Sequence, residues 1–270
     1  MERMRVERDA AALGDGEGSA GRRRAAPALL LVAALLGAWE LYARAGGVDE
    51  LVLPAPSAIG EALWTDRGLL AENFLVTATE IAGGIALALV LGCALAVALH
   101  VSRPVRGALY PLLVASQAIP IVILAPLLVI WLGFGVLPKL AIIALVCFFP
   151  VVVTTLDGLR AVDPDQRKLL RTMDASRTAL LRFVELPAAA PAALSGARIA
   201  VAVAVVGAVF AEYAGSSEGL GHLMLQAVPQ LDTARAWAAV VVLAAFAVIL
   251  FTALGALERR LTYNGGGSHS

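Results

Sequence analysis

Charged side chains are scarce in this chain of 270 residues, because Asp, Glu, Lys and Arg together make up only 16% of it. Soluble domains carry about 25% charged and about 45–50% apolar residues, whereas 60% of this chain is hydrophobic. This imbalance excludes an ordinary soluble enzyme and a disordered segment. The 21 basic residues are matched by 21 acidic ones, so no excess positive charge is available for nucleic acid. We therefore predict a protein of the lipid bilayer with no nucleic-acid partner.

Lysine and cysteine are rarer still, with two residues of each. A phosphate-binding loop needs a glycine-rich turn that ends in Gly-Lys-Ser or Gly-Lys-Thr, but Lys139 follows a proline and Lys168 follows an arginine. We therefore predict no ATP hydrolysis and no catalytic residues in this chain. Cys93 and Cys147 lie inside apolar runs, and neither has a His or a second Cys at a metal-binding spacing. We predict that both are buried and that the chain itself binds no metal and no cofactor.

Long apolar runs are abundant. A bilayer core about 30 Å thick needs roughly 20 apolar residues per helix, and six runs reach this length. They lie at 27–46, 81–101, 109–133, 137–156, 191–213 and 236–257. We predict an all-α, polytopic fold with six transmembrane helices.

The first run follows three arginines, as a signal peptide would. It is nevertheless full length and ends in Trp39, Glu40 and Tyr42, which is typical of an interfacial belt and not of a cleavage site. We expect it to be retained. The predicted organisation is an N-terminal tail at 1–26, a transmembrane domain at 27–260 and a C-terminal tail at 261–270, the end of which resembles a linker.

Basic residues are distributed unevenly between the segments that join these runs. With the N-terminus inside the cell, 17 of the 21 basic residues lie at inner ends, and only Arg44, Arg67, Lys139 and Arg235 lie at outer ends. Cytoplasmic segments of membrane proteins carry an excess of Lys and Arg. We therefore predict that both termini are cytoplasmic.

Three prolines interrupt the third run, at Pro111, Pro120 and Pro126, with Ser116 and Gln117 between the first two. Proline removes a backbone donor, and the carbonyls that it frees need other helices, polar side chains or water as partners in lipid. We predict that this helix lies inside the bundle or beside a cavity. A purely structural kink is the alternative.

The inner loop at 157–190, between the fourth and fifth runs, begins with the pattern of a short amphipathic helix. Asp163 suits a helix cap and Pro164 a first helical turn. The apolar residues that follow share one face: Leu169, Leu170 and Met173. We predict a cytoplasmic helix there.

A second short helix is predicted from Arg177 to Val184, ending before Pro187. Together the two helices form a pair between the fourth and fifth transmembrane helices. Their apolar face needs a partner in the cytosol. The alternative is a pair that lies on the membrane surface with its basic side toward anionic lipid.

The end of this loop resembles the cytoplasmic motif of permease subunits of binding-protein-dependent ABC importers. That motif begins with Glu-Ala-Ala, contains a glycine and ends in Ile-x-Leu-Pro, and Val184-Glu185-Leu186-Pro187 matches its end. Counting back places Asp174 at the glycine and Lys168-Leu169-Leu170 at Glu-Ala-Ala, so the start departs from the family pattern. LPAPSAIGEAL, FFPVVVTTLDGLRAVD and AEYAGSSEGLGHLM also resemble the family, in order, within residues 30–260. The likeness is greatest to the nitrate, sulfonate, taurine and thiamine-precursor branch.

The resemblance implies a type I, methionine-importer-like permease in a bacterial inner membrane. It implies a homodimer of this chain, two ATPase subunits that bind ATP and Mg, and an extracytoplasmic solute-binding protein. The helix pair at 157–190 would then couple the permease to the ATPase. The residues expected to do so are Leu169, Leu170, Met173, Asp174, Ala175, Ser176, Leu186 and Pro187. Because Asp tolerates turn geometry and can cap a helix, we expect Asp174 to preserve function while altering the choice of ATPase.

Ionisable groups inside predicted transmembrane helices are candidate functional residues. Glu80, His100 and Glu212 all lie near helix ends, where solvation is the simpler interpretation. Glu212 is the exception, because by resemblance the 212–222 stretch shapes the outer gate and receives the binding protein. The residues predicted to form the pathway or gate are Ser116, Gln117, Pro120, Thr154, Thr155 and Glu212. For the polar side chains among them, helix packing is an equal alternative.

Two other classes of protein fit the composition less well. A secondary transporter working alone would favour inverted repeats and acidic residues near the midplane, and a membrane enzyme would need a catalytic constellation; neither is visible in the sequence. For the solute, the stretch AVPQLDTARAWAAVVVLAAFAVILF is most similar to permeases for thiamine-precursor pyrimidines, with riboflavin importers close by. Sulfonates, taurine and nitrate are the alternatives.

Overall fold

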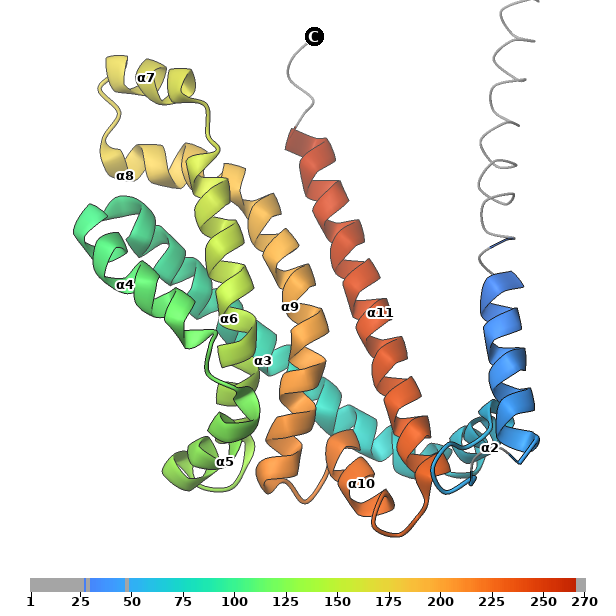
Figure 1. Cartoon of the computed structure of the whole chain (residues 1–270). Coiled ribbons are helices and arrows are strands. Elements are labelled where there is room, and N and C mark those ends of the chain that lie inside the picture. The colour runs from blue at the N-terminus through green and yellow to red at the C-terminus, as the bar shows by residue number, and fades with distance from the viewer. Residues whose placement is uncertain (1–26, 28–29, 47–48, 266–270) are drawn as a thin grey trace, which may run out of the picture.

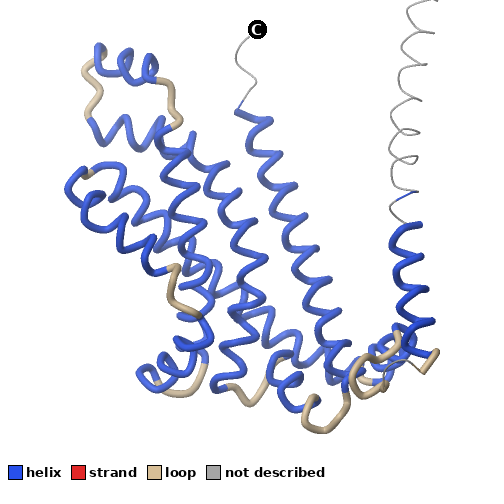
Figure 2. The backbone as a smooth tube through the Cα atoms, in the orientation of Figure 1, coloured by secondary structure: helices blue, strands red, loops and turns tan. Residues whose placement is uncertain are grey.

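The computed structural model describes residues 27, 30–46 and 49–265, and every regular element in this part of the chain is a helix (Figure 2). The predicted tail at 1–26 lies outside the described residues. A helix over 30–44 comes first. The helices that follow are α2 (Pro56–Thr65), α3 (Arg67–Val101), α4 (Arg103–Ser116), α5 (Ile121–Leu132), α6 (Val136–Arg160), α7 (Pro164–Thr172), α8 (Arg177–Leu180), η1 (Leu181–Glu185), α9 (Leu186–Gly215), α10 (Leu220–Ala227) and α11 (Thr233–Gly265). The predicted all-α class is confirmed.

Four helical segments of the described chain are long and apolar enough to cross a membrane. They are Arg67–Val101, Val136–Arg160, Arg177–Gly215 and Thr233–Arg260, and α4 with α5 forms a fifth if the bent pair counts as one span. The chain is therefore a polytopic membrane protein with four to five candidate spans among the described residues. The predicted count of six also includes the run at 27–46, which the structure describes only in part.

The core is formed where α6 packs between α3 and α9 (Figure 1). Small residues allow the backbones to approach: a side chain at Gly92 would meet Val151, and one at Gly207 would meet Val146. In a membrane, where lipid is as apolar as the helices, such close van der Waals packing drives helix association. Of the two cysteines predicted to be buried, Cys147 is fully buried among these residues, whereas Cys93 is only partly buried.

The third predicted run, 109–133, is not one helix, so this prediction is wrong. It breaks after Ser116, and α4 and α5 meet at an angle of 106°. The break has a local cause, because Pro120 offers no N–H and takes an extended conformation with φ −65° and ψ 125°. Pro111 and Pro126, by contrast, are accommodated inside α4 and α5.

The second loop helix does not end before Pro187, and this prediction is also wrong. The chain continues from α8 through the π-helical turn η1 directly into α9, as one helical segment of 39 residues. Pro187 lies in the first turn of α9, where its missing N–H is tolerated. In the π-helical turn at 181–185 the backbone hydrogen bonds span one residue more than in an α-helix. This change in register precedes the proline, which has no N–H to donate.

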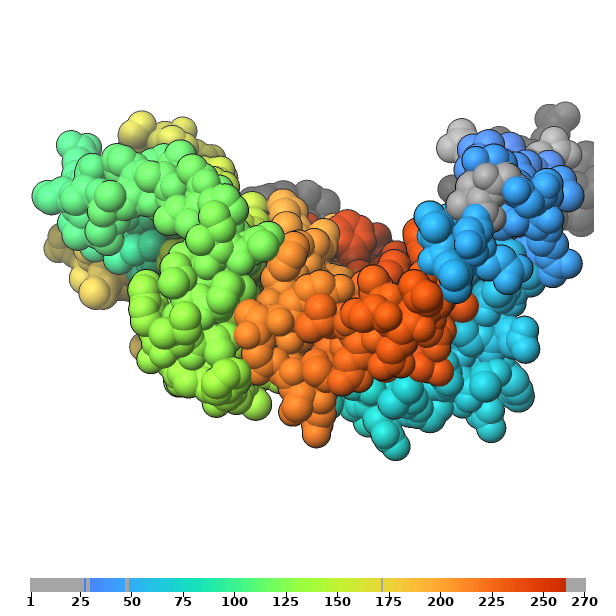
Figure 3. Space-filling model, turned by 60° about the horizontal axis from the view of Figure 1, so that its bottom comes forward, coloured from blue at the N-terminus to red at the C-terminus, as the bar shows by residue number. Residues whose placement is uncertain are grey.

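The first helix stands apart from the other helices in Figures 1 and 3 and joins them near α2. Trp39 packs edge-on against Trp237 of α11 with ring centroids 5.5 Å apart. Glu40 accepts hydrogen bonds from the backbone N and the Oγ of Ser57, at 3.0 and 2.7 Å. These contacts attach the lower end of the helix over 30–44 to α2 and α11, while most of its apolar side chains are exposed.

Candidate functional site

The loop helices α7 and α8 form a hairpin that projects beyond the ends of α6 and α9 (Figure 1). Asp163 Oδ1 accepts a hydrogen bond of 2.8 Å from the N–H of Asp165, and Pro164 is the first residue of α7. Both features match the predicted helix start. The helix pair therefore exists at the place where the sequence predicts it.

The turn between α7 and α8 is built around Asp174. Its φ of 60° lies in the left-handed region that glycine adopts most easily, which explains why the importer motif carries a glycine at this position. The predicted capping role of Asp174 is wrong, because Ser176 caps α8 and accepts a 3.2 Å hydrogen bond from the N–H of Ala179. Asp174 thus holds the turn and Ser176 starts the helix.

The hairpin and the η1 turn that follows it expose apolar side chains. Leu169 is 62% exposed, Met173 70% and Phe183 72%, while Leu170 and Ala175 are half-buried. Leu186 and Pro187, at the start of α9, are also exposed. A cluster of large exposed apolar residues on a short helix pair is typical of an interaction surface. Phe183 belongs to this surface, although the sequence analysis did not select it.

Glu185 joins the hairpin to the bundle. Its side chain is buried and accepts from His100 Nε2 of α3 at 3.0 Å and pairs with Arg167 Nε of α7 at 3.0 Å. Arg167 also donates to the carbonyl of Leu159 at the end of α6. The prediction that His100 is simply solvated is therefore wrong. Glu185 fixes α7 against the ends of α3 and α6 that lie beside the hairpin. From the sequence it is predicted only as part of the motif.

The predicted pathway residues occupy two separate places. Ser116, Gln117 and Pro120 lie at the break between α4 and α5, and the Oγ of Ser116 donates to the Leu113 carbonyl at 2.7 Å. Thr154 and Thr155 lie on α6: Thr154 donates to the carbonyl of Pro150 at 2.8 Å, and Thr155 is buried. In the described part of the chain, no hydrogen bond joins the two groups. Their role in a solute path stays a prediction.

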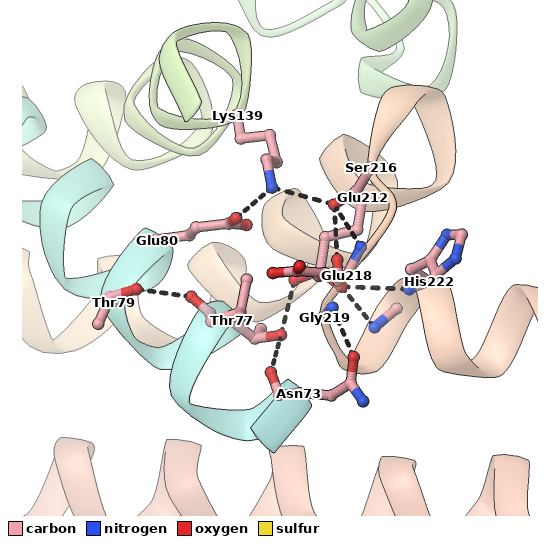
Figure 4. A network of polar contacts seen from close by, with 12 residues as sticks. Asn73, Thr77, Thr79, Glu80, Lys139, Glu212, Ser216, Glu218, Gly219 and His222 are labelled. Carbon is pink, nitrogen blue, oxygen red and sulfur yellow. Dashed lines mark hydrogen bonds and ion pairs between the residues drawn. The ribbon is translucent and has the colours of Figure 1, made fainter. Parts of the chain in front are cut away.

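Glu212, near the end of α9, is the centre of a buried polar network (Figure 4). It is fully buried, and it accepts hydrogen bonds from Thr77 Oγ1 at 2.6 Å and from the N–H groups of Gly221 and His222 at 2.6 and 3.2 Å. Thr77 in turn accepts from the N–H of Leu220. The carboxylate therefore attaches the start of α10 to α3. The gate role expected for Glu212 stays a prediction.

A second part of this network is an ion pair between α3 and α6. Lys139 donates to Glu80 and, at 3.0 Å, to the Oγ of Ser216, and both charged side chains are buried. The sequence predicts Lys139 as a charge at an outer end and Glu80 as a solvated group, and the prediction for Glu80 is wrong. In the structure they compensate each other inside the protein, as a buried charge requires. Ser216 links the pair to the loop that leads to α10.

The backbone of that loop completes the network. Asn73 Oδ1 accepts a 2.8 Å hydrogen bond from the N–H of Gly219, which has a φ of 110°. A side chain at Gly219 would collide with the Glu212 carboxylate, so both conformation and space require glycine here. Helices α3, α6, α9 and α10 thus converge on one polar centre at the end of the molecule opposite the α7–α8 hairpin (Figures 1 and 4).

Comparison with known proteins identifies the family. Residues 84–263 match the family described as the binding-protein-dependent transport system inner membrane component. The chain belongs to this family. It is a multi-pass inner-membrane permease subunit of an ABC importer, a transport component and not the catalytic subunit. Membership implies ATPase and binding-protein partners.

Three relatives cover most of the permease. A probable ABC transporter permease of Haemophilus influenzae is 39% identical over 236 residues, which are 87% of this chain and 96% of the relative. The formylaminopyrimidine transport permease ThiX of Halalkalibacterium halodurans is 36% identical over 84% of this chain and 91% of its own length. The riboflavin permease RibX of Chloroflexus aurantiacus is 34% identical over 84% of this chain and 85% of its own.

Among solved structures, the permease resembles a chain of the MetNI methionine ABC transporter in its inward-facing conformations. The TM-score is 0.62, and the match covers 72% of this chain and 97% of that chain at 19% sequence identity. This similarity shows that the folds are alike. It confirms the predicted methionine-importer-like fold.

Proposed function

We propose that this permease serves an importer for a thiamine-precursor pyrimidine or a closely related heterocycle. The observation that carries the proposal is the similarity to the formylaminopyrimidine permease, at 36% identity over 84% of the chain. The riboflavin permease follows at 34%, which makes riboflavin the second candidate. Both compounds are flat nitrogen heterocycles, unlike sulfonates, taurine and nitrate.

The proposed assembly is a homodimer of six-helix permeases with both termini in the cytoplasm. The uneven distribution of basic residues supports this orientation, because six of them lie between Arg160 at the end of α6 and Arg182 in η1, and the hairpin between these residues then faces the cytosol. In the proposed homodimer each chain contributes one coupling hairpin, and each hairpin contacts one of the two ATPase subunits. One solute-binding protein on the outer face supplies the solute, and ATP and Mg are bound by the ATPases.

The α7–α8 hairpin is the proposed coupling element. Its exposed apolar side chains, Leu169, Met173 and Phe183, offer the surface that a groove on the ATPase would cover. Glu185 holds the other side of the hairpin to α3 and α6 through His100 and Arg167. A rigid-body movement of the ATPase would therefore move the inner ends of these helices together.

The proposed outer gate is the 212–222 segment together with the α4–α5 break. Glu212 supports this role by holding the loop before α10, and Ser116, Gln117, Pro120, Thr154 and Thr155 are the proposed pathway residues. A secondary transporter working alone is disfavoured, since Glu80 is already compensated by Lys139 and Glu212 receives its hydrogen bonds from within the chain.

The experiment is solute uptake into proteoliposomes that contain the permease, its ATPase and the solute-binding protein encoded beside it. We expect ATP-dependent accumulation of a radiolabelled aminopyrimidine that unlabelled aminopyrimidine suppresses and taurine does not. Vesicles without ATP are the control, because a secondary transporter would still accumulate solute there. Uptake of taurine, nitrate or a sulfonate instead of the pyrimidine would contradict the proposed solute class.

A further inference from the structure

A polar cavity of about 890 Å³ lies where the α3–α4 corner, the end of α6 and the α7–α8 hairpin meet. In Figure 1 this is the region beside and below α8, where α3 turns into α4. Its wall contains the arginines Arg103, Arg106, Arg160, Arg167 and Arg177, together with His100 and one acidic residue, Glu185. Its volume is within the range of about 300–1,000 Å³ that is typical of ligand sites.

Within the described residues, four of the five arginines of this cavity have no acidic partner, and Arg167 alone forms an ion pair, with Glu185. Arg106 donates to the carbonyls of Leu99 and His100, at 2.8 and 3.3 Å, and Arg177 donates to the carbonyl of Val101. These bonds hold two guanidinium groups in place without neutralising them. Among the lining residues, five arginines against one glutamate leave a formal excess of four positive charges.

Two of the arginines have free donors on the exposed side of the cavity. Arg103 and Arg160 are exposed, and no ion pair or side-chain hydrogen bond engages either of them within the described residues. Arg103 is also the first residue of α4, a helix of 14 residues, whose N-terminal end adds positive potential. Like charges held this close together repel one another, so an anion in the cavity would stabilise the arrangement.

The position of the cavity indicates which anion fits. α3 ends at Val101, α4 begins at Arg103 and α6 ends at Arg160, so two candidate membrane spans and the bent α4–α5 pair have an end at its level. Directly along α4, Leu109, Leu112 and Val114 are exposed, at 39%, 65% and 48%, and Figures 1 and 3 show α4 at the outer edge of the molecule. A charged cavity suits the polar group of an amphiphile, and the apolar face of α4 beside it suits the hydrocarbon chains.

We propose that this arginine cavity binds the phosphate headgroup of an anionic phospholipid, with the acyl chains lying along α4. Arginine recognises phosphate through paired N–H donors, and such charge-assisted hydrogen bonds are stronger than neutral ones. The exposed apolar face of α4 favours a lipid over free phosphate, which has no chain to cover it. Bound there, the headgroup would join the α3–α4 corner to the base of α8. This inference is independent of the transported solute.

The test measures lipid binding to the purified permease by native mass spectrometry, with phosphatidylglycerol and phosphatidylcholine as probes. We expect saturable binding of phosphatidylglycerol and only background binding of phosphatidylcholine. Arg103→Gln combined with Arg160→Gln should weaken phosphatidylglycerol binding by at least about tenfold, since two charge-assisted contacts are lost. The control, Arg182→Gln combined with Arg260→Gln, removes the same charge outside the cavity and should bind as the wild type does.

Other outcomes assign the cavity differently. Inorganic phosphate that displaces the lipid at equal concentration, with no advantage for acylated probes, would show that the site recognises free phosphate and overturn the lipid proposal. Unchanged lipid binding in the Arg103 and Arg160 variant, accompanied by loss of the ATPase on purification, would show a protein contact and likewise overturn it. Arg103→Lys combined with Arg160→Lys keeps the charge and guards against misfolding; it should bind lipid better than the Gln variant.

Discussion

The substitution Met173→Asp tests the coupling role of the α7–α8 hairpin. Met173 is 70% exposed in the isolated chain, so its replacement removes little packing inside the permease and should change the free energy of unfolding by less than about 0.5 kcal/mol. If an ATPase groove covers this side chain, the variant leaves an unpaired charge buried at the interface. Such a charge costs about 3–5 kcal/mol, which corresponds to binding weaker by roughly a hundredfold to a few thousandfold.

The measurement is the affinity of the ATPase for the permease in nanodiscs, together with solute-stimulated ATP hydrolysis in proteoliposomes. We expect Met173→Asp to release the ATPase and abolish stimulated hydrolysis, while the permease still inserts and dimerises. Met173→Leu, which keeps an apolar side chain, should behave as the wild type does. Thr172→Asp places the same charge on the neighbouring residue, the last of α7, and should have a smaller effect.

The two interpretations of the hairpin give opposite results. A helix pair that merely lies on the membrane surface would lose its attachment to lipid in Met173→Asp and leave transport nearly intact. Full retention of the ATPase and wild-type turnover in this variant would therefore refute the coupling role. Loss of ATPase binding in Met173→Asp but not in Met173→Leu would support it.

Three further predictions concern the buried ion pair, the hairpin turn and the topology. Lys139→Met leaves Glu80 buried without its ion-pair partner and should lower the free energy of unfolding by about 3–5 kcal/mol. The double variant Glu80→Gln/Lys139→Met should lower it clearly less, because no charge is then left unpaired. Thermal unfolding in detergent compares the two variants. Asp174→Gly should leave the free energy of unfolding nearly unchanged or raise it by up to about 1 kcal/mol, because glycine adopts the φ of 60° more easily. ATPase activity should also remain. A large loss of stability or of ATPase activity would contradict this account of the turn. Cysteine introduced at Ser217 should react with an impermeant reagent added outside cells, and cysteine at Ala175 only with one added inside; the reverse pattern would overturn the predicted orientation.

The class of fold and the loop hairpin are predictable from the sequence because both depend on local patterns. An apolar run of about 20 residues predicts a membrane helix regardless of its neighbours, and Asp163 with Pro164 marks a helix start. The family is also predictable, because the residues around Glu185-Leu186-Pro187 resemble the importer motif. The match over residues 84–263 confirms this prediction. These features need no knowledge of which helices pack together.

The two polar networks are not predictable in the same way, because their members are far apart in the chain. Glu80 and Lys139 are separated by 59 residues, and Thr77 and Glu212 by 135. Each residue lies near the end of an apolar run predicted from the sequence, where solvation and burial fit the sequence equally well. Only the packing of α3 against α6 and α9 decides between these alternatives, and it places all four side chains inside.

The effects of Pro120 and Pro187 on their helices are not predictable from the sequence either, for a different reason. Pro120 and Pro187 both follow apolar residues and remove one backbone donor each, yet one breaks a predicted helix and the other is absorbed. The difference lies in the preceding turn: the residues before Pro120 close a tight turn, with the N–H of Ala118 bonded to Ala115 at 3.1 Å, whereas η1 widens before Pro187. A sequence pattern shows that proline lacks a backbone N–H donor. It does not show the change in backbone hydrogen-bond register that compensates for this loss.

The arrangement of α9 suggests how movement at the hairpin would reach the outer side of the membrane. α9 continues from α8 and η1 without a break, and its 30 residues span about 45 Å at 1.5 Å per residue. Glu185 fixes its inner end to α3 and α7, and Glu212 fixes its outer end to Thr77 and to the start of α10. Because both ends are attached through buried carboxylates, a tilt imposed on α8 would be carried to the 216–222 segment with little bending in between. In the proposed mechanism, α9 is therefore the element that links ATPase docking to the outer gate.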